Sequence, residues 1–221
     1  TNSQLKKFKK FFSNKIKVID CTFEIDSSLK ERIEEIRIEC ETSVREGSSS
    51  IILTDKGIKS NRASIPSARI VGAVHSHLVK HGLRGYCSLN VECSDALDTH
   101  SFAVLIGVGA TTINPYLAID SIYQRYEKKL FGKSDFKDCI RRFKKSIDAG
   151  LLKIMSKMGI SVISSYRGGC NFEAVGLSRA IVSDYFPGMS SRISGIGVNG
   201  IEEKIKNLHE KFSKKNVYTL P

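Results

Sequence analysis

The chain has 221 residues, a net charge of +12 and a pI of about 9.4. Its 41% hydrophobic and 26% charged residues are typical of a soluble globular protein. No apolar run approaches the roughly 20 residues of a membrane-spanning helix, and the N-terminus has no apolar signal-peptide core. The composition therefore predicts a cytoplasmic protein with no membrane partner, made of one large domain or parts of two.

The positive charge raises the question of an anionic partner. Lysine-rich stretches at Lys6–Lys10 and Lys204–Lys215 have aromatic neighbours, which suit single-stranded nucleic acid. Elsewhere basic residues alternate with acids, as in Leu29–Arg45, and this is the pattern of a solvated helix surface. We therefore expect no nucleic-acid partner and keep a basic nucleic-acid-binding module as an alternative.

The cysteines give no sign of a metal site. They contain no CxxC pair, and the spacing of Cys87 and Cys93 matches neither a zinc knuckle nor an iron–sulfur run. In a chain of this class they are expected to be reduced thiols. The six are Cys21, Cys40, Cys87, Cys93, Cys139 and Cys170.

In the first half, short β-branched runs alternate with helical periodicity. This rhythm, with continuously apolar strands, predicts an α/β fold whose parallel strands are covered by helices. The predicted elements are a strand at Lys15–Phe23, a helix from Ser27 or Ser28 to Arg45, a strand at Ser50–Thr54, a helix from Pro66 to His81, a strand at Tyr86–Val91, a helix at Asp95–Val108, a strand at Thr111–Asn114 and a helix opened by Pro115.

The polar stretch Phe131–Asp138 separates two helices, so we place a domain boundary near Gln124–Ser134. After it, a long helix at Asp135–Met158 contains Gly150, which could kink or divide it. The remaining predicted elements are a strand at Ile160–Ser165, a short helix from Asn171, a helix from Ser178 to Tyr185, a glycine-rich stretch at Ser194–Gly200 and a helix at Ile201–Phe212.

The run Ser164-Ser165-Tyr166-Arg167-Gly168-Gly169 is the main candidate site, because it follows a predicted strand and precedes a helix. Ligands of parallel α/β proteins bind at the carboxyl ends of strands. Hydroxyl groups and glycine N–H groups can hold a phosphate, and an arginine can clamp a phosphate or carboxylate. The alternative is a strand exit with glycines chosen for turn geometry and Arg167 in a surface ion pair.

Histidines supply a weaker signal. His77 and His81 share one helix face, but no carboxylate or cysteine lies within a turn of them to complete a metal site, so we predict none. His100 with Asp98 lacks a paired nucleophile. Gly107-Val-Gly109 is predicted to end a helix, whereas a dinucleotide-binding motif needs a strand, a glycine turn and then a helix.

Four longer runs carry a resemblance to a known family. They resemble the large subunits of glutamate synthases, most closely the alphaproteobacterial type, although many relatives have Ala-Gln-Ile at positions 169–171. The resemblance extends from about Ser50 onward and is looser before it. The runs are Gly72–Arg84 (GAVHSHLVKHGLR), Ser88–Ala118, Gly150–Ser178 and Tyr185–Gly197 (YFPGMSSRISGIG).

The resemblance implies an oxidoreductase that forms glutamate from glutamine and 2-oxoglutarate. Ammonia released from glutamine travels to a (β/α)8 barrel that holds FMN and a 3Fe–4S cluster. Electrons come from NADPH through a small FAD-containing subunit, or from ferredoxin. By this resemblance residues 1–125 are the C-terminal part of the central domain, and residues 126–221 begin the FMN-binding barrel.

The resemblance also implies roles for single residues. Ser164, Ser165, Tyr166, Arg167 and Gly168 would line the FMN or 2-oxoglutarate side of the barrel mouth, joined by Glu173 from the following helix. The cluster ligands and most barrel strands are not in this sequence, so we expect a segment of a longer protein that is inactive alone. Another FMN-dependent barrel oxidoreductase is the second alternative.

Overall fold

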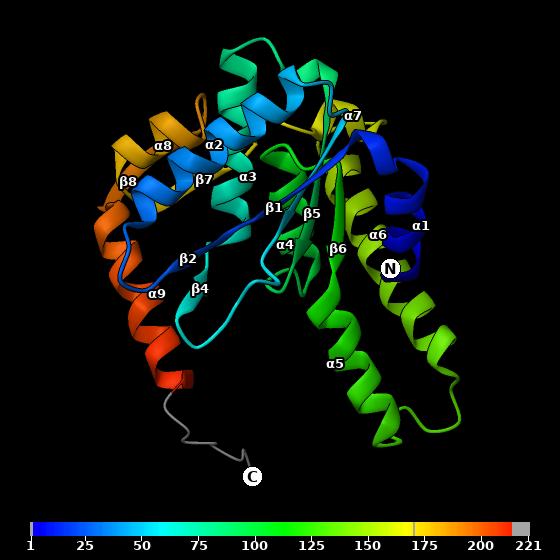
Figure 1. Cartoon of the computed structure of the whole chain (residues 1–221). Coiled ribbons are helices and arrows are strands. Elements are labelled where there is room, and N and C mark those ends of the chain that lie inside the picture. Colours follow the sequence, from blue (N-terminus) through cyan, green and yellow to red (C-terminus); the bar gives the residue numbers. More distant parts are fainter. Residues whose placement is uncertain (1, 170, 214–221) are drawn as a thin grey trace.

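The computed structural model describes residues 2–169 and 171–213. Its centre is a four-stranded, fully parallel sheet in the order β1-β3-β5-β6, which confirms the predicted α/β class (Figure 1). Between consecutive strands of this sheet the chain passes through a helix, as parallel pairing requires. The strands are β1 (Ile16–Asp20), β3 (Ser50–Thr54), β5 (Ser88–Cys93) and β6 (Thr112–Pro115).

Three helices connect these strands: α2 (Leu29–Arg45), α3 (Ser67–Lys80) and α4 (Thr99–Gly107). The hydroxyl of Ser28 accepts a hydrogen bond from the first turn of α2, as the sequence predicted. The predicted start of α4 at Asp95 is wrong by four residues, because the carboxylate of Asp98 caps the helix by accepting from Ser101 N at 2.8 Å. Helix α3 packs against both α2 and α4.

The two faces of the sheet differ in polarity. Ile51 and Leu53 belong to the main hydrophobic core, together with side chains of α2 and α3. On β5, however, Asn90 and Glu92 are buried, so the expectation of continuously apolar strands is wrong for this strand. Asn90 can be buried because its amide donates to Ser50 Oγ at 2.8 Å and accepts from the hydroxyl of Thr112 at 2.7 Å.

The predicted strand Lys15–Phe23 is divided into two. After β1, the chain leaves the parallel sheet, and β2 (Thr22–Glu24) pairs antiparallel with β4 (Arg62–Ser64). The guanidinium group of Arg62 holds this corner, donating to Thr22 Oγ1 at 3.0 Å and lying 3.4 Å from Asp20 Oδ2. A local pattern of β-branched residues does not reveal which partner strand each half will pair with.

The remaining elements surround this sheet. Helix α1 lies beside α6 at one side of the molecule, and α9 lies at the opposite side (Figure 1). Two single-turn 3-10 helices, Ser13–Lys15 and Arg84–Tyr86, precede β1 and β5. The other elements are α1 (Asn2–Phe11), α5 (Tyr116–Glu127), α6 (Phe136–Lys157), α7 (Ile163–Tyr166), β7 (Glu173–Leu177), α8 (Arg179–Tyr185), β8 (Ser190–Ile196) and α9 (Val198–Ser213).

The strand predicted at Ile160–Ser165 is wrong. Residues 163–166 form the one-turn helix α7, and residues 161–165 are exposed. A strand is stable only when its backbone pairs with a neighbour, and no described strand pairs with this segment. The described residues form no closed barrel, so the proposed start of a (β/α)8 barrel stays a prediction.

The short helix predicted from Asn171 is also wrong. Residues 173–177 form β7, which pairs in parallel with β8, and β8 includes part of the glycine-rich stretch predicted at Ser194–Gly200. Gly176 has a φ of +77°, which a helix does not allow. Gly195 lies so close to the backbone of Gly176 that a side chain there would collide with it. Two glycines therefore allow the strands to approach.

Helix α6 is continuous through Gly150, so Gly150 does not divide it, and the alternative of a kink stays a prediction. A Cβ at Gly150 would lie 2.5 Å from Thr99 Cγ2 of α4. The glycine is therefore explained by the close approach of two helices. The two sides of residue 125 share the main core, which contains Leu89 and Val91 as well as Ile147 and Ile181. The domain division near residue 125 therefore stays a prediction.

No described helix is long and apolar enough to cross a membrane.

Candidate functional site

The six predicted site residues do not converge on one point. Ser164 and Ser165 lie on α7 and are exposed, while Tyr166 is buried. Glu173 begins β7, not a helix as predicted, and its carboxylate lies 3.6 Å from Nε of Arg192. Arg167 and Gly168 lie beside polar residues of the central α/β unit. They form the part of the predicted site that the fold supports.

Tyr166 anchors the loop. Its ring is 2% exposed and packs with Ala103 of α4 and Met155 of α6. Phe172 meets it edge-on at a centroid distance of 6.3 Å. Burial raises the pKa of the Tyr166 phenol, so the group stays neutral. These contacts assign Tyr166 a packing role.

Gly168 brings the loop next to α3 and α4. Its N–H donates to the carbonyl oxygen of Ile106 at 3.3 Å, and its φ of +70° favours glycine. A Cβ at this position would lie 3.0 Å from Nε2 of His75. The glycine is therefore needed both for its backbone conformation and for the close approach to the imidazole.

His75 and Arg84 form a half-buried pair beside this loop. Arg84 Nε donates to His75 Nδ1 at 3.0 Å, and its other nitrogens donate to the carbonyl oxygens of Cys87 and Gly109 at 2.6 and 2.9 Å. Burial, together with the charge of Arg84, lowers the pKa of His75 to about 4. The imidazole is therefore neutral at pH 7, and because Nδ1 accepts, Nε2 carries the proton.

Arg167 adds a second guanidinium group to this corner. Its Nε is buried and has no hydrogen-bond partner among the described residues. Burial lowers the pKa of Arg84, and the positive charge of Arg167 lowers it further. An unpaired buried donor and two neighbouring like charges are both stabilised by an anion. The corner therefore has the chemistry of a phosphate or carboxylate subsite.

The space beside this corner is small. A cavity of about 170 Å³ is lined by His75, Gly107, Gly168 and the segment 185–187. Cavities that hold a drug-sized ligand have volumes of about 300–1,000 Å³. This cavity therefore has room for one small group and not for a whole flavin.

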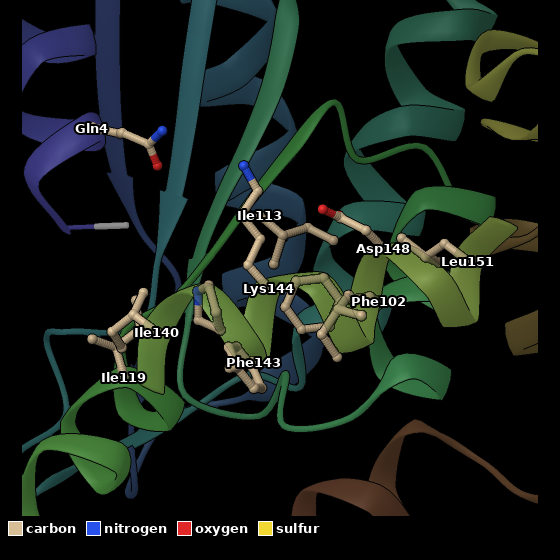
Figure 2. A pocket seen from close by; sticks show the side chains of 11 residues that line it. Gln4, Phe102, Ile113, Ile119, Ile140, Phe143, Lys144, Asp148 and Leu151 are labelled. Carbon is tan, nitrogen blue, oxygen red and sulfur yellow. The ribbon is translucent and has the colours of Figure 1, made fainter. Parts of the chain in front are cut away.

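A larger cavity of about 260 Å³ lies between α1, α4, α5 and α6. Figure 2 shows the rings of Phe102 and Phe143 on one side of it, with the charged ends of Lys144 and Asp148 and the amide of Gln4 on the other. Its walls are mainly apolar, with Ile113, Pro115, Ile119, Ile140, Ile147 and Leu151 completing the lining. This lining does not suit a phosphate.

A polar cluster that the sequence patterns did not single out lies at the carboxyl end of β5. Glu92 is 4% exposed and accepts from Lys56 Nζ at 2.6 Å and from Thr54 Oγ1 at 3.2 Å, with Lys9 Nζ at 3.5 Å. Burial opposes its ionisation, but the bond from Lys56 and the charge of Lys9 hold its pKa below the usual value. Two lysines and a threonine of the same chain thus compensate for the burial of this carboxylate.

The two lysine-rich stretches do not form one surface. Lys6–Lys10 lies on α1, and Lys204 and Lys206 lie on α9 at the opposite side of the molecule (Figure 1). Lys214 and Lys215, like Cys170, lie outside the described residues. The five other cysteines are buried free thiols, and burial raises the pKa of Cys87.

Similarity to known proteins gives this geometry a context. Residues 1–178 match the family described as the glutamate synthase central domain. The chain is 49% identical, over its whole length, to the glutamate synthase [NADPH] large chain of Azospirillum brasilense, and it covers 15% of that protein. It is 39% identical to the corresponding Bacillus subtilis chain over 86% of its own length, covering 12% of that relative.

A ferredoxin-dependent glutamate synthase of Pyropia yezoensis is 37% identical over 87% of the chain, which covers 14% of that relative. The chain thus spans about one seventh of the length of these relatives. The family match covers most of the sequence, including α1 to α7 and the Arg167–Gly168 corner. The chain belongs to the glutamate synthase family, within which it represents the central-domain region.

Proposed function

We propose that this chain is part of a glutamate synthase large chain, which reductively transfers glutamine-derived ammonia to 2-oxoglutarate to give L-glutamate. The observation that carries the proposal is the central-domain match over residues 1–178, with 49% identity along the whole chain to a relative of that name. Because the chain covers 15% of that relative, we propose that it is inactive alone and acts in the cytoplasm as one segment of the complete enzyme.

The cofactors proposed for the complete enzyme are FMN and a 3Fe–4S cluster. FMN would supply hydride to the carbon that receives the ammonia nitrogen. The proposed electron donor is NADPH through a small FAD-containing subunit, because the relatives at 49% and 39% identity are both named as NADPH enzymes. The proposed division assigns residues 1–125 to the C-terminal part of the central domain and residues 126–221 to the start of the FMN-binding domain. The central-domain match, which continues to residue 178, extends across this boundary.

The contribution proposed for this segment is the anion corner. The unpaired Nε–H of Arg167, the charge of Arg84 and the Nε2–H of the neutral His75 lie near the Gly168 backbone. They fit one anionic group, either the phosphate of FMN or a carboxylate of 2-oxoglutarate. Ser164, Ser165 and Glu173 would take part only through contacts with residues outside this chain.

The function is tested on the complete polypeptide that carries this chain, purified with its small subunit. We expect NADPH to be oxidised only when glutamine and 2-oxoglutarate are both present, in an amount equal to the 2-oxoglutarate consumed, with two glutamates formed for each NADPH. Separate reactions with NADH and with reduced ferredoxin identify the donor. Flavin reduction without glutamine-dependent glutamate formation would instead support another FMN-dependent oxidoreductase and reject the proposal.

Replacing Arg167 by alanine in the complete enzyme is expected to weaken binding of the anionic group by about tenfold, the cost of one charge-assisted hydrogen bond. The measurements are FMN content after dialysis and the KM for 2-oxoglutarate. A fall in FMN content assigns the phosphate to Arg167, and a rise in KM assigns the carboxylate. Arg141→Ala removes an exposed arginine on α6 and serves as the control. If both measurements stay normal, Arg167 has only a structural role.

A further inference from the structure

The histidines that the sequence left without a third ligand acquire one in the fold. His77 and His81 lie one turn apart at the end of α3, and Glu41 lies in the penultimate turn of the neighbouring helix α2. Glu41 Oε2 is 2.7 Å from His77 Nε2 and 3.2 Å from His81 Nδ1. One ligand atom from each of the three residues lies within 4.8 Å of the others. We propose that Glu41, His77 and His81 bind a divalent transition-metal ion, with Zn²⁺ as the best match.

The donor set supports this assignment. Two imidazole nitrogens and one carboxylate oxygen are a common three-residue zinc ligand set, in which water takes the fourth position. Zinc–ligand bonds of about 2.0–2.2 Å in a tetrahedron place neighbouring ligand atoms roughly 3.3 Å apart. The distance of 3.2 Å from Glu41 Oε2 to His81 Nδ1 is close to this value, and the 2.7 Å to His77 Nε2 is shorter, as in a hydrogen bond. A small movement of the carboxylate away from His77 therefore admits the ion.

The surroundings favour a cation that is reached from solvent. The side chains of Glu41, His77 and His81 are 21%, 16% and 35% exposed, so both an ion and a water ligand have access. The site lies near the C-terminal ends of α2 and α3, where unpaired carbonyl groups concentrate negative potential. Two helix dipoles therefore add to the attraction of the carboxylate.

Arg45 holds the third ligand in place. Its Nε and Nη2 lie 2.9 and 2.8 Å from Glu41 Oε1, which leaves Oε2 for the histidines. Such a contact to the non-ligating atom orients a metal ligand. The positive charge of Arg45 repels a metal ion at this site, but Arg45 is 56% exposed, so water screens the repulsion. Metal binding would join α2 to α3 and stabilise the contact between them.

The test is a Zn²⁺ titration of the purified 221-residue protein against a chromophoric chelator. We expect one Zn²⁺ per chain, and a loss of affinity of at least about tenfold in His81→Ala, His77→Ala and Glu41→Gln. His100→Ala, which removes an exposed histidine on another helix, should bind like the parent protein. Co²⁺ in place of Zn²⁺ should give the intense visible absorption of a tetrahedral site.

His81 lies at the exposed end of α3, so His81→Ala keeps the test independent of folding, and its melting temperature without metal checks this. Zn²⁺ should raise the melting temperature of the parent protein and leave that of His81→Ala unchanged. Absence of binding by the folded parent protein, or equal affinity in the parent and His81→Ala proteins, would overturn the proposal. These measurements do not depend on synthase activity.

Discussion

Replacing Gly109 by alanine should lower the free energy of unfolding by about 4 kcal/mol, the sum of a strained backbone and a steric collision. The φ of Gly109 is +122°, outside the range that alanine adopts readily. A Cβ there would collide with the imidazole ring of His75 and lie 2.9 Å from its Cβ atom. Because domains are stable by only about 5–15 kcal/mol, urea unfolding would show this loss clearly.

Gly47 offers a matched control for this variant. Its φ of +95° is also positive, but a Cβ there would meet nothing within 4 Å. Gly47→Ala should therefore cost only the backbone strain, about 1–2 kcal/mol. If Gly109→Ala costs no more than Gly47→Ala, then the imidazole can move away freely and the close packing of the His75 corner is not important for stability.

The second large effect is a loss of stability on acidification that depends on His75. Its pKa is about 4 in the folded chain against 6.5 for an ordinary histidine, because burial and Arg84 disfavour the charged ring. As the pH falls below 6.5, His75 binds a proton in the unfolded chain but not in the folded chain. The free energy of unfolding therefore decreases from its value above pH 6.5 until the pH reaches about 4. The shift corresponds to about 3 kcal/mol, which partial exposure reduces to about 2 kcal/mol.

The measurement is urea unfolding of the parent protein and of His75→Gln at pH 7 and pH 4.5. Glutamine cannot take up a proton in this range, and it keeps a polar amide near the position of the imidazole. The variant should therefore lose about 2 kcal/mol less than the parent protein between the two pH values. His100→Gln, at an exposed histidine, should behave like the parent protein. Equal losses in the parent and His75→Gln proteins would show that His75 titrates normally in the folded state.

These two predictions concern residues whose importance the sequence did not indicate. His75 and Arg84 are nine residues apart, and Gly168 is more than eighty residues beyond them. The sequence singled out Arg167 and Gly168 because they lie in a glycine-rich run that contains an arginine. The structure adds His75 and Arg84 as their neighbours. No periodicity signals such a corner, because its members come from different elements and are brought together only by the packing of α3 and α4.

The sequence alone determined the alternation of strands and helices in the first half of the chain. Ser50–Thr54 is a strand with the predicted bounds, and α2 begins after Ser28. These features depend on local chemistry: β-branched residues in a short buried run, and a hydroxyl that caps the first turn of a helix. Neighbouring residues supply this information, so a single sequence is sufficient.

Only the tertiary structure decided the elements and sites that depend on distant partners. Residues 160–165 have strand-like composition but pair with no strand among the described residues, whereas β7 exists because β8 lies beside it. Glu41 completes the cluster with His77 and His81 although 36 residues separate it from the first of them. Backbone pairing and ligand geometry are properties of atoms close in space. Residues that are far apart in the sequence give no local pattern that predicts such contacts. The paired strands and the Glu41 cluster could therefore be recognised only in the folded structure.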